Sequence, residues 1–212
     1  PTTVNESLYS LLSMCLCVLT HRFPPIPFAL SLRSPSPIPV NSAYRESVRN
    51  FYQEKLVPFH EEWEEQGQVP RELWQDAGAN GMLCVTVPEE YGGMGLDVLF
   101  ASINWQEQSY AGTSGPGWYL HSEIVAPYLV HYGTEEQKQR WLPPMCTGDV
   151  ITAIAMTEPG AGSDLQGMKT TAIKDGDDYI INGSKVFITN GWLSDMVIVC
   201  AKTDPAKGAK GI

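Results

Sequence analysis

The hydrophobic periodicity of this chain changes at Gly148, and this change limits the folds that are available to it. Before Gly148, apolar residues recur at the three- and four-residue spacing of amphipathic helices. After it, short β-branched and apolar runs alternate with turn residues, as they do in strands. A chain with its helices first and its strands second is typical of an α+β protein with separate helical and sheet domains.

Several helices are expected before Gly148. Asp97 can cap a helix that runs to about Tyr110, and Thr134-Glu-Glu-Gln137 is a capping box for a helix that Pro143-Pro144 stops. The remaining helices are expected over residues 42–59, where Ser42 is a possible cap, over residues 70–78, with Pro70 in the first turn and Gly78 past the end, and over residues 118–131.

After Gly148 the pattern predicts four or five short antiparallel strands. The turn Asp175-Gly-Asp-Asp178 separates two of them, and Asn182-Gly183 is a strong hairpin signal. The strands are expected at residues 149–157, 170–174, 179–181, 185–189 and 196–202. Because so small a sheet leaves an edge unpaired, we expect the sequence to be a fragment.

Residues 1–40 differ in composition from the rest of the chain. They hold seven of the sixteen prolines and one acidic residue, Glu6. The apolar run Leu8–Leu19 is shorter than the ~20 residues that cross a bilayer, and no basic segment precedes it as in a secretory signal. We interpret residues 1–40 as a disordered leader, or alternatively as an organelle transit segment, ahead of a helical domain at 41–148 and a β domain at 149–212.

Composition and charge disfavour several classes of function. The chain has 14 basic and 24 acidic residues, a net charge of −10, and no long basic run, which disfavours nucleic-acid binding. The five cysteines are scattered without a C-x-x-C pair, so we expect neither a disulfide framework nor a zinc site, and a reducing compartment. His60, His121 and His131 lack the spacing of metal ligands, so no metal site is expected.

The segment richest in chemical possibilities is a glycine-rich turn, Thr157-Glu-Pro-Gly-Ala-Gly-Ser-Asp164. Gly160 and Gly162 allow successive backbone N–H groups to point into one concavity, which suits a phosphate. The turn is not a G-x-G-x-x-G dinucleotide fingerprint, and Ser163 does not stand in a G-x-S-x-G nucleophile elbow. Taken alone, such a turn between strands is more often structural than functional.

This turn, together with Asn182-Gly-Ser-Lys-Val-Phe-Ile-Thr-Asn190, resembles the acyl-CoA dehydrogenase family. The likeness covers nearly all of the chain after residue 41 and includes Pro88–Gly93 and Gly133–Lys138 in the family's order. Within the family, the segments Ser47–Lys55 and Ser114-Gly-Pro-Gly117 are most similar to the long-chain members. Residues 1–40 have no counterpart in the family.

The resemblance implies an all-α N-terminal domain, a truncated antiparallel β-barrel domain, and a C-terminal helical bundle that is absent from this chain. It also implies non-covalently bound FAD. Thr157 would bond the flavin ring, Ser163 would reach the pyrophosphate and touch the acyl-CoA, Phe187 would pack on the ring, and Thr189 would lie near its reactive nitrogen. The full set of implied cofactor contacts is Ile154, Ala155, Met156, Thr157, Glu158, Pro159, Gly160, Ala161, Gly162, Ser163, Phe187, Ile188 and Thr189.

The implied reaction is the α,β-dehydrogenation of a long-chain fatty acyl-CoA in β-oxidation, in the mitochondrial matrix. Electron-transfer flavoprotein would be the electron acceptor, and the complete protein would be a homotetramer without a transmembrane segment. The family's carboxylate base lies beyond Ile212, so we assign no catalytic residue and expect this chain alone to be inactive. Glu158 is expected to belong to the loop scaffold, and Glu107 and Glu123 to be structural or solvated.

Two alternatives remain open at this point. One is an enzyme like the peroxisomal acyl-CoA oxidases, which share the architecture and pass electrons to oxygen. The other is a catalytically inactive, truncated product. Within the dehydrogenase interpretation, we expect Pro116 to cut a helix short and thereby to lengthen the acyl pocket.

Overall fold

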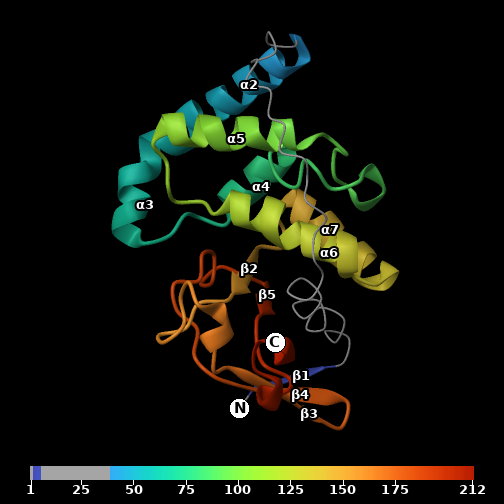
Figure 1. Ribbon diagram of the computed structural model, residues 1–212. Helices are drawn as coiled ribbons and strands as arrows, with labels where there is room; N and C mark the ends of the chain where they lie inside the picture. Colours follow the sequence, from blue (N-terminus) through green and yellow to red (C-terminus); the bar gives the residue numbers. More distant parts are fainter. Residues whose placement is uncertain (1, 6–38) are drawn as a thin grey trace, which may run out of the picture.

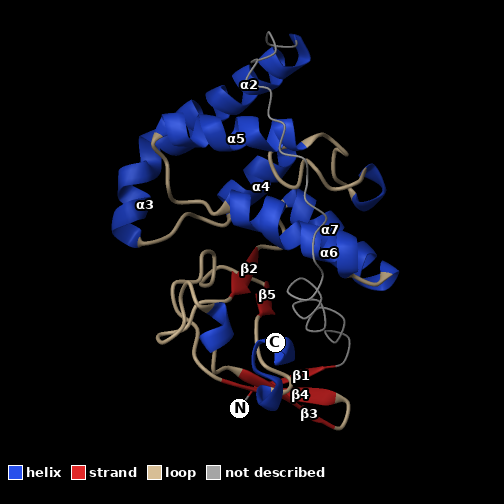
Figure 2. Cartoon of the chain, in the orientation of Figure 1, coloured by secondary structure: helices blue, strands red, loops and turns tan. Residues whose placement is uncertain are grey.

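The computed structural model of the chain describes residues 2–5 and 39–212 (Figure 1). The helices of the first part form one layer, and the strands lie together below it in the view of Figure 2. The run Leu8–Leu19 lies outside the described residues, and so does most of the expected leader. Over the described ranges, no helix is both long and apolar enough to cross a membrane.

The helical part begins earlier than the sequence indicates. Helix α2 (Pro39–Phe51) includes Ser42, so the expectation that Ser42 caps the helix is wrong. The helical chain continues without a break through a π turn and a 3-10 turn into α3. The helical elements after α2 are η2 (Tyr52–Leu56), η3 (Val57–Phe59), α3 (His60–Gln66), α4 (Glu72–Ala79), η4 (Glu89–Tyr91), α5 (Val98–Ala111), η5 (Leu120–Val125), α6 (Ala126–Tyr132) and α7 (Glu135–Thr147).

The local start signals of two helices are confirmed. The carboxylate of Asp97 accepts a hydrogen bond of 2.8 Å from the N–H of Leu99 at the start of α5. At the start of α7, the N–H of Gln137 donates to the Thr134 hydroxyl at 3.3 Å, and the Thr134 N–H donates to the Gln137 side chain at 2.9 Å. These capping side chains pair backbone N–H groups that the helix itself leaves unpaired.

Helix α7 does not stop at Pro143-Pro144, contrary to the sequence-based expectation, but continues to Thr147. The two prolines remove backbone hydrogen bonds, yet Leu142 and Met145 on either side are completely buried in the core. Packing of these side chains therefore outweighs the lost hydrogen bonds, and the helix ends at Gly148, which has a φ of 80°.

Helices α4 and α7 touch backbone to backbone. Gly78 lies inside α4 rather than past its end, and a Cβ there would stand 2.3 Å from the carbonyl oxygen of Thr147. At Gly148 a Cβ would stand 2.2 Å from the carbonyl oxygen of Trp74. Glycine at both positions is what permits this approach, because any side chain would force the helices apart.

Two large hydrophobic clusters fill the interior of the described chain. One surrounds Trp74 and Trp118 and joins α2, η2 and α4 to Trp118, which lies just before η5. The other contains Leu129 and Leu142 together with Ile198, and so joins α6 and α7 to a strand of the β part. The second cluster therefore fastens the helical layer onto the strands.

The strands form two small sheets rather than one antiparallel sheet. Strands β1 (Thr2–Asn5), β4 (Asp178–Asn182) and β3 (Thr171–Asp175) are antiparallel in that spatial order. Strands β2 (Thr152–Ala155) and β5 (Met196–Val199) pair in parallel, so the expectation of antiparallel strands throughout is wrong for this pair. The described residues do not form a closed barrel. The expectation of a disordered leader at residues 1–40 is wrong for strand β1 and for Pro39 and Val40, which begin α2.

The turn at Asp175–Asp178 is confirmed, because β3 and β4 pair across it with these two residues opposite each other. The hairpin expected at Asn182-Gly183 does not form, and residues 185–189 are not a strand. Strand β4 already has β3 on one edge and β1 on the other, so neither edge remains for a further strand. Instead, Gly183 packs on Thr170, where a Cβ would stand 2.2 Å from the hydroxyl oxygen.

A buried histidine joins the helices to β2. Nδ1 of His121 accepts a hydrogen bond from the Thr152 N–H at 3.2 Å, and Nε2 donates to the carbonyl oxygen of Met145 at 3.1 Å. This pairing requires the neutral ring with its proton on Nε2. Burial lowers the pKa of His121 to about 4, although the hydrogen bond to Met145 opposes the shift.

We predict that protonation of His121 contributes to acid unfolding. The ordinary pKa of 6.5 applies in the unfolded chain, so stability falls as the pH drops from 6.5 towards 4, by up to about 3 kcal/mol. His121→Asn is expected to be less stable at neutral pH but to lose less stability over this interval. Urea unfolding at a series of pH values measures both. The exposed His131→Asn serves as the control, and a pH dependence of His121→Asn equal to that of the parent would contradict the prediction.

Candidate functional site

The glycine-rich turn and the segment around Phe187 are bound to each other. The N–H of Val186 donates to the carbonyl oxygen of Thr157 at 3.0 Å. The ammonium of Lys185 donates to the carbonyl oxygen of Met156 and to the carboxylate of Glu158, both at 2.9 Å. The two segments singled out from the sequence therefore lie side by side, although neither forms a strand with the other.

Glu158 is the centre of this arrangement. Its side chain is 7% exposed, and its carboxylate accepts hydrogen bonds from the N–H of Lys169 at 2.6 Å and of Thr170 at 2.9 Å, besides the one from Lys185. Burial favours the neutral acid, but the hydrogen bonds from Thr170, Lys169 and Lys185 lower the pKa of Glu158 to about 2. An ionised carboxylate held by three groups fits the scaffold role expected from the sequence.

The other two glutamates considered from the sequence are also tied to neighbours. Glu107 is buried and accepts hydrogen bonds from Arg45 at 2.6 Å and Arg49 at 2.9 Å. Glu123 accepts a hydrogen bond of 3.0 Å from the Thr86 hydroxyl, and burial raises its pKa. Both lie in the helical part, away from the glycine-rich turn.

Phe187 has an unusual conformation and an unusual exposure. Its side chain is 93% exposed and its φ is 57°. A bulky residue with positive φ is rare, because its Cβ crowds the backbone, and it persists only when its neighbours hold it. Two neighbours are held in this way. The backbone N–H of Val186 is hydrogen-bonded to Thr157, and the side chain of Asn190 is hydrogen-bonded to the backbone of Gly117 and Thr152. A strained, exposed aromatic side chain next to a glycine-rich turn is typical of a ligand site.

Gly160 and Gly162 are exposed, and a Cβ at either position would meet no atom within 4 Å. Neither has a positive φ, so the backbone conformation does not require glycine. Two backbone hydrogen bonds close the turn tightly. The N–H of Ala161 donates to the carbonyl oxygen of Glu158 at 3.1 Å, and the N–H of Glu158 donates to that of Ala161 at 2.9 Å. The two glycines leave space beside the turn that the described chain does not fill.

The remaining residues expected to bind a cofactor alternate between core and surface. Those in β2 are buried, whereas most of those in the turn and in the Phe187 segment reach the surface. Ile154, Ala155 and Ala161 are buried; Met156, Thr157 and Ile188 are half-buried; Pro159, Ser163 and Thr189 are exposed. An apolar floor therefore lies next to polar, accessible groups.

Asn190 and Gly117 form a connection that sequence reasoning missed. The Asn190 amide donates to the carbonyl oxygens of Gly117 at 2.9 Å and of Thr152 at 3.1 Å. A Cβ at Gly117 would stand 2.5 Å from the methyl group of Thr189. The loop that follows α5 thus touches the Phe187 segment, and no motif in the sequence links these two positions.

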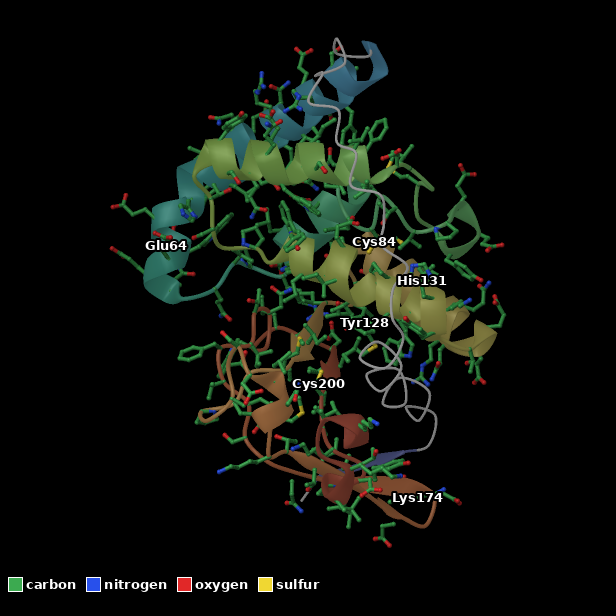
Figure 3. All side chains as sticks on the ribbon, in the orientation of Figure 1. Glu64, Cys84, Tyr128, His131, Lys174 and Cys200 are labelled. Carbon is green, nitrogen blue, oxygen red and sulfur yellow. The ribbon has the colours of Figure 1, made fainter. Side chains whose placement is uncertain are left out.

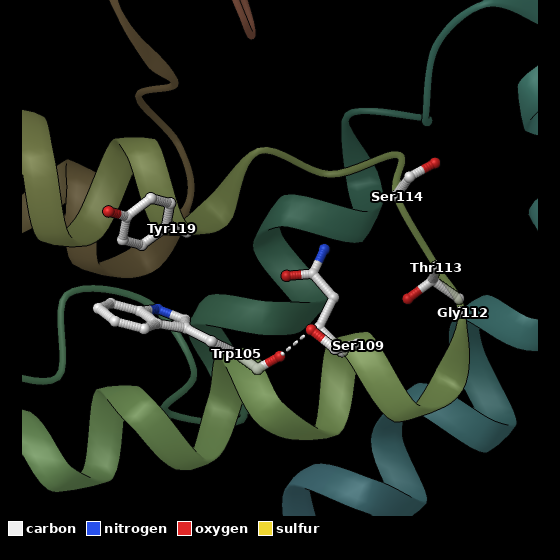
Figure 4. A pocket seen from close by; sticks show the side chains of 7 residues that line it. Trp105, Ser109, Gly112, Thr113, Ser114 and Tyr119 are labelled. Atoms are coloured by element: carbon white, nitrogen blue, oxygen red, sulfur yellow. Dashed lines mark hydrogen bonds between the residues drawn. The ribbon is translucent and has the colours of Figure 1, made fainter.

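A cavity of about 510 Å³ lies at the end of α5 (Figure 4). The rings of Trp105 and Tyr119, edge to face with centroids 4.4 Å apart, form an aromatic wall. Pro116 belongs to no helix, and the next helical residue is Trp118. The lining residues are Trp105, Gln108, Ser109, Gly112, Thr113, Ser114 and Tyr119.

Metal-ligating residues do not gather anywhere in the described ranges, where no group of three or more could hold a metal ion. Figure 3 shows Cys84 and His131 in the helical part and Cys200 apart from them, just after β5.

Comparison with known proteins assigns this architecture to a family. The model of the acyl-CoA dehydrogenase N-terminal domain matches residues 40–149, and the model of the middle domain matches residues 153–212. The chain belongs to the acyl-CoA dehydrogenase family. The resemblance inferred from the sequence motifs is therefore confirmed.

Curated members of the family match most of this chain but contain much more. Long-chain specific acyl-CoA dehydrogenase, mitochondrial, of Rattus norvegicus is 57% identical over 76% of this chain and 37% of its own length. Isovaleryl-CoA dehydrogenase, mitochondrial, of Solanum tuberosum is 41% identical over 80% of this chain and 42% of its own. The chain thus spans less than half the length of these relatives.

Solved structures of the family share the fold. Acyl-CoA dehydrogenase from Geobacillus kaustophilus is 49% identical, with a TM-score of 0.77 over 79% of this chain and 44% of the other. A glutaryl-CoA dehydrogenase from Mycobacterium smegmatis in complex with FADH2 is 33% identical, with a TM-score of 0.72 over 79% and 43%. This likeness confirms a helical N-terminal part followed by a sheet part.

We predict that Glu158 stabilises the fold only while it is ionised. In the unfolded chain its pKa is the ordinary 4.5, so its contribution, about 3 kcal/mol, is present above pH 4.5 and is lost as the pH falls towards 2. Glu158→Gln should therefore be less stable than the parent at pH 7 by up to this amount, with a difference that shrinks in acid. Urea unfolding followed by circular dichroism measures it. The exposed Glu61→Gln is the control, and a difference that does not depend on pH would contradict the prediction.

Proposed function

We propose that this chain is part of an FAD-dependent acyl-CoA dehydrogenase that acts on long-chain fatty acyl-CoA, and that the glycine-rich turn and the Phe187 segment form one half of its flavin site. The observation that carries the proposal is the hydrogen bond from Val186 to Thr157, which fixes the exposed Phe187 beside the turn. The names of the rat, pig and mouse relatives, all long-chain specific acyl-CoA dehydrogenases, support the reaction and the substrate class.

The residues present fit a flavin. A flavin needs an apolar surface for its ring, a few oriented polar groups and a place for its phosphates. Phe187 offers an exposed aromatic face, and the open sides of Gly160 and Gly162 leave space for a phosphate beside the backbone of the turn. The relative whose structure is described as a complex with FADH2 supports this choice of cofactor.

Each residue of the half-site has a proposed role. Thr157 would hydrogen-bond the ring, Ser163 would bind the pyrophosphate and also contact the acyl-CoA, and Thr189 would lie near the reactive nitrogen. Phe187 covers one face of the ring and keeps water away from it. Glu158 and Lys185 hold the two segments in register. When bound, FAD supplies the acceptor for the hydride that leaves the β-carbon of the substrate.

This chain supplies no catalytic base in the proposal. The α-proton requires a carboxylate within hydrogen-bonding reach of the α-carbon, whereas Glu158 is ionised and already bound by Lys169, Thr170 and Lys185. We propose that the base lies beyond Ile212, in the helical bundle that the family resemblance implies.

The cavity at the end of α5 is the proposed seat of the acyl chain. Gly117 places the loop that borders this cavity directly against Thr189 of the flavin segment. Pro116 keeps residues 114–117 out of the helix that begins at Trp118, and this is the proposed source of room for a long chain. Trp105 and Tyr119 give the cavity an apolar wall.

We further propose the mitochondrial matrix as the location, from the names of the mitochondrial relatives. The proposed electron acceptor is electron-transfer flavoprotein, and a solved structure described as an electron transferring flavoprotein of Acidaminococcus fermentans is 37% identical to this chain, with a TM-score of 0.73. The complete protein is proposed to be a homotetramer. Dehydrogenase names among the relatives favour this reaction over that of an oxygen-using oxidase.

Flavin retention tests the half-site. The chain is incubated with FAD and separated by gel filtration, and its affinity is measured by quenching of flavin fluorescence. Phe187→Ala and Gly162→Ala are each expected to weaken binding by on the order of tenfold, through loss of an aromatic contact and obstruction of the phosphate space. Gly162→Ala should leave the melting temperature unchanged, because its Cβ meets no protein atom.

Tyr110→Ala provides the matched control, because it removes an exposed aromatic side chain from helix α5, outside the proposed flavin half-site. A folded parent chain, as judged by circular dichroism, that retains no FAD would overturn the half-site. Variants with the affinity of the parent would do the same.

A further inference from the structure

The chain contains three Asn-Gly pairs, at residues 80–81, 182–183 and 190–191. Asparagine is a chemically labile residue. It is more labile before glycine, because the following residue has no side chain to keep its backbone nitrogen away from the asparagine amide. Ring closure between these two groups needs a backbone N–H and an amide that are free to move. The surroundings of each pair therefore determine whether it reacts.

Asn80-Gly81, at the end of α4, is held at both groups. The N–H of Gly81 donates to the carbonyl oxygen of Gly78 at 2.9 Å, and the amide of Asn80 donates to the carbonyl oxygen of Asp76 at 2.8 Å. Asn80 is exposed, so its protection comes from these hydrogen bonds and not from burial. Closing the ring requires both of them to break.

Asn190-Gly191 is held in the same way. The N–H of Gly191 donates to the carbonyl oxygen of Ile188 at 2.9 Å. The amide of Asn190 donates to the carbonyl oxygens of Gly117 and Thr152, and the residue is half-buried. Three hydrogen bonds therefore oppose ring closure at this pair.

Asn182-Gly183, at the end of β4, has neither kind of protection. Both residues are exposed, and among the described residues neither the Asn182 amide nor the Gly183 N–H has a hydrogen-bond partner. The pairing of β4 ends at Asn182 opposite Thr171 on one edge and at Ile181 opposite Thr2 on the other. The sheet therefore stops just short of the Gly183 nitrogen.

We propose that Asn182 is a site of spontaneous conversion to isoaspartate and aspartate. The Gly183 nitrogen forms a bond to Cγ of Asn182, the bond from Cγ to the amide nitrogen breaks, and ammonia leaves with the proton that Gly183 gives up. Water then opens the succinimide ring at either carbonyl, which yields isoaspartate or aspartate. The only co-reactant is water, and the site does not depend on the proposed function.

The position of Asn182 gives the conversion a structural consequence. In isoaspartate the backbone runs through the former side chain and is longer by one carbon, or about 1.5 Å. Gly183 packs on Thr170, whose N–H donates to the carboxylate of Glu158, and Lys185 donates to the same carboxylate two residues further on. The contact leaves no room for a longer backbone, so we expect conversion to pull Lys185 away from Glu158.

Peptide mapping of the aged chain tests the site. The 212-residue chain is incubated at mildly alkaline pH and body temperature, and mass spectrometry with isoaspartate-specific methylation quantifies each Asn-Gly pair. Asn182 is expected to convert at least about fivefold faster than Asn80 or Asn190, the factor that one intact hydrogen bond is worth. In urea the three rates should converge, because the reacting dipeptide is the same.

Trypsin tests the consequence, because it cuts the chain after Lys185. The Lys185 side chain is 11% exposed in its ion pair with Glu158, so the parent should be cut slowly there. The converted chain carries one more negative charge and is separated by anion exchange. We expect it to be cut at Lys185 on the order of fivefold faster, through loss of that pairing.

Two variants serve as matched controls. Asn182→Gln, incubated identically, should remain unconverted and resist trypsin, because its longer side chain forms the ring far more slowly. Asn182→Asp adds the charge without lengthening the backbone, so it should be cut at Lys185 as slowly as the parent.

Equal conversion at the three pairs of the folded chain would overturn the inference. The same order of rates in urea as in the folded chain would also overturn it, since the fold would then not determine which pair reacts. A converted chain that is cut after Lys185 no faster than the parent would overturn the coupling of Asn182 to Glu158.

Discussion

The buried carboxylate of Glu158 is the interaction on which the arrangement of the site depends. A buried charge is tolerated only when hydrogen bonds replace its lost hydration. Those of Glu158 come from the backbone of Lys169 and Thr170, just before β3, and from the side chain of Lys185. One ionised group therefore joins three segments, and through Lys185 and Val186 it helps to hold the exposed and strained Phe187 in place.

Short sequence motifs predicted the elements of the fold well wherever neighbouring residues alone determine the local structure. Asp97 and the Thr134–Gln137 box mark helix starts because a single side chain pairs the first backbone groups. The predictions were wrong where contacts with residues far away in the sequence determine the structure. Helix α7 passes its proline pair because Leu142 and Met145 are buried, and Asn182-Gly183 forms no hairpin because both edges of β4 are taken. The parallel pairing of β2 with β5 depends on which strands meet, which no short motif encodes.

The candidate site likewise has a part that could be predicted from sequence motifs and a part that could not. Its two contiguous segments, 157–164 and 182–190, could be singled out because each carries an ordered motif. The contacts that position them join residues far apart in the sequence, such as Glu158 with Lys185 and Asn190 with Gly117.

Gly117 has a consequence for how such a protein can change over time. The loop beside the cavity and the segment beside the glycine-rich turn share a partition with no room for even one methyl group. A substitution there would reshape both compartments at once, so selection for a new ligand would also disturb the neighbouring one. Trp105 and Ser114 also line the cavity, but the described contacts of their side chains are with Tyr119 and Glu64, so variation is freer there. Diversification of this lineage should therefore concentrate on the far wall and leave the partition constant.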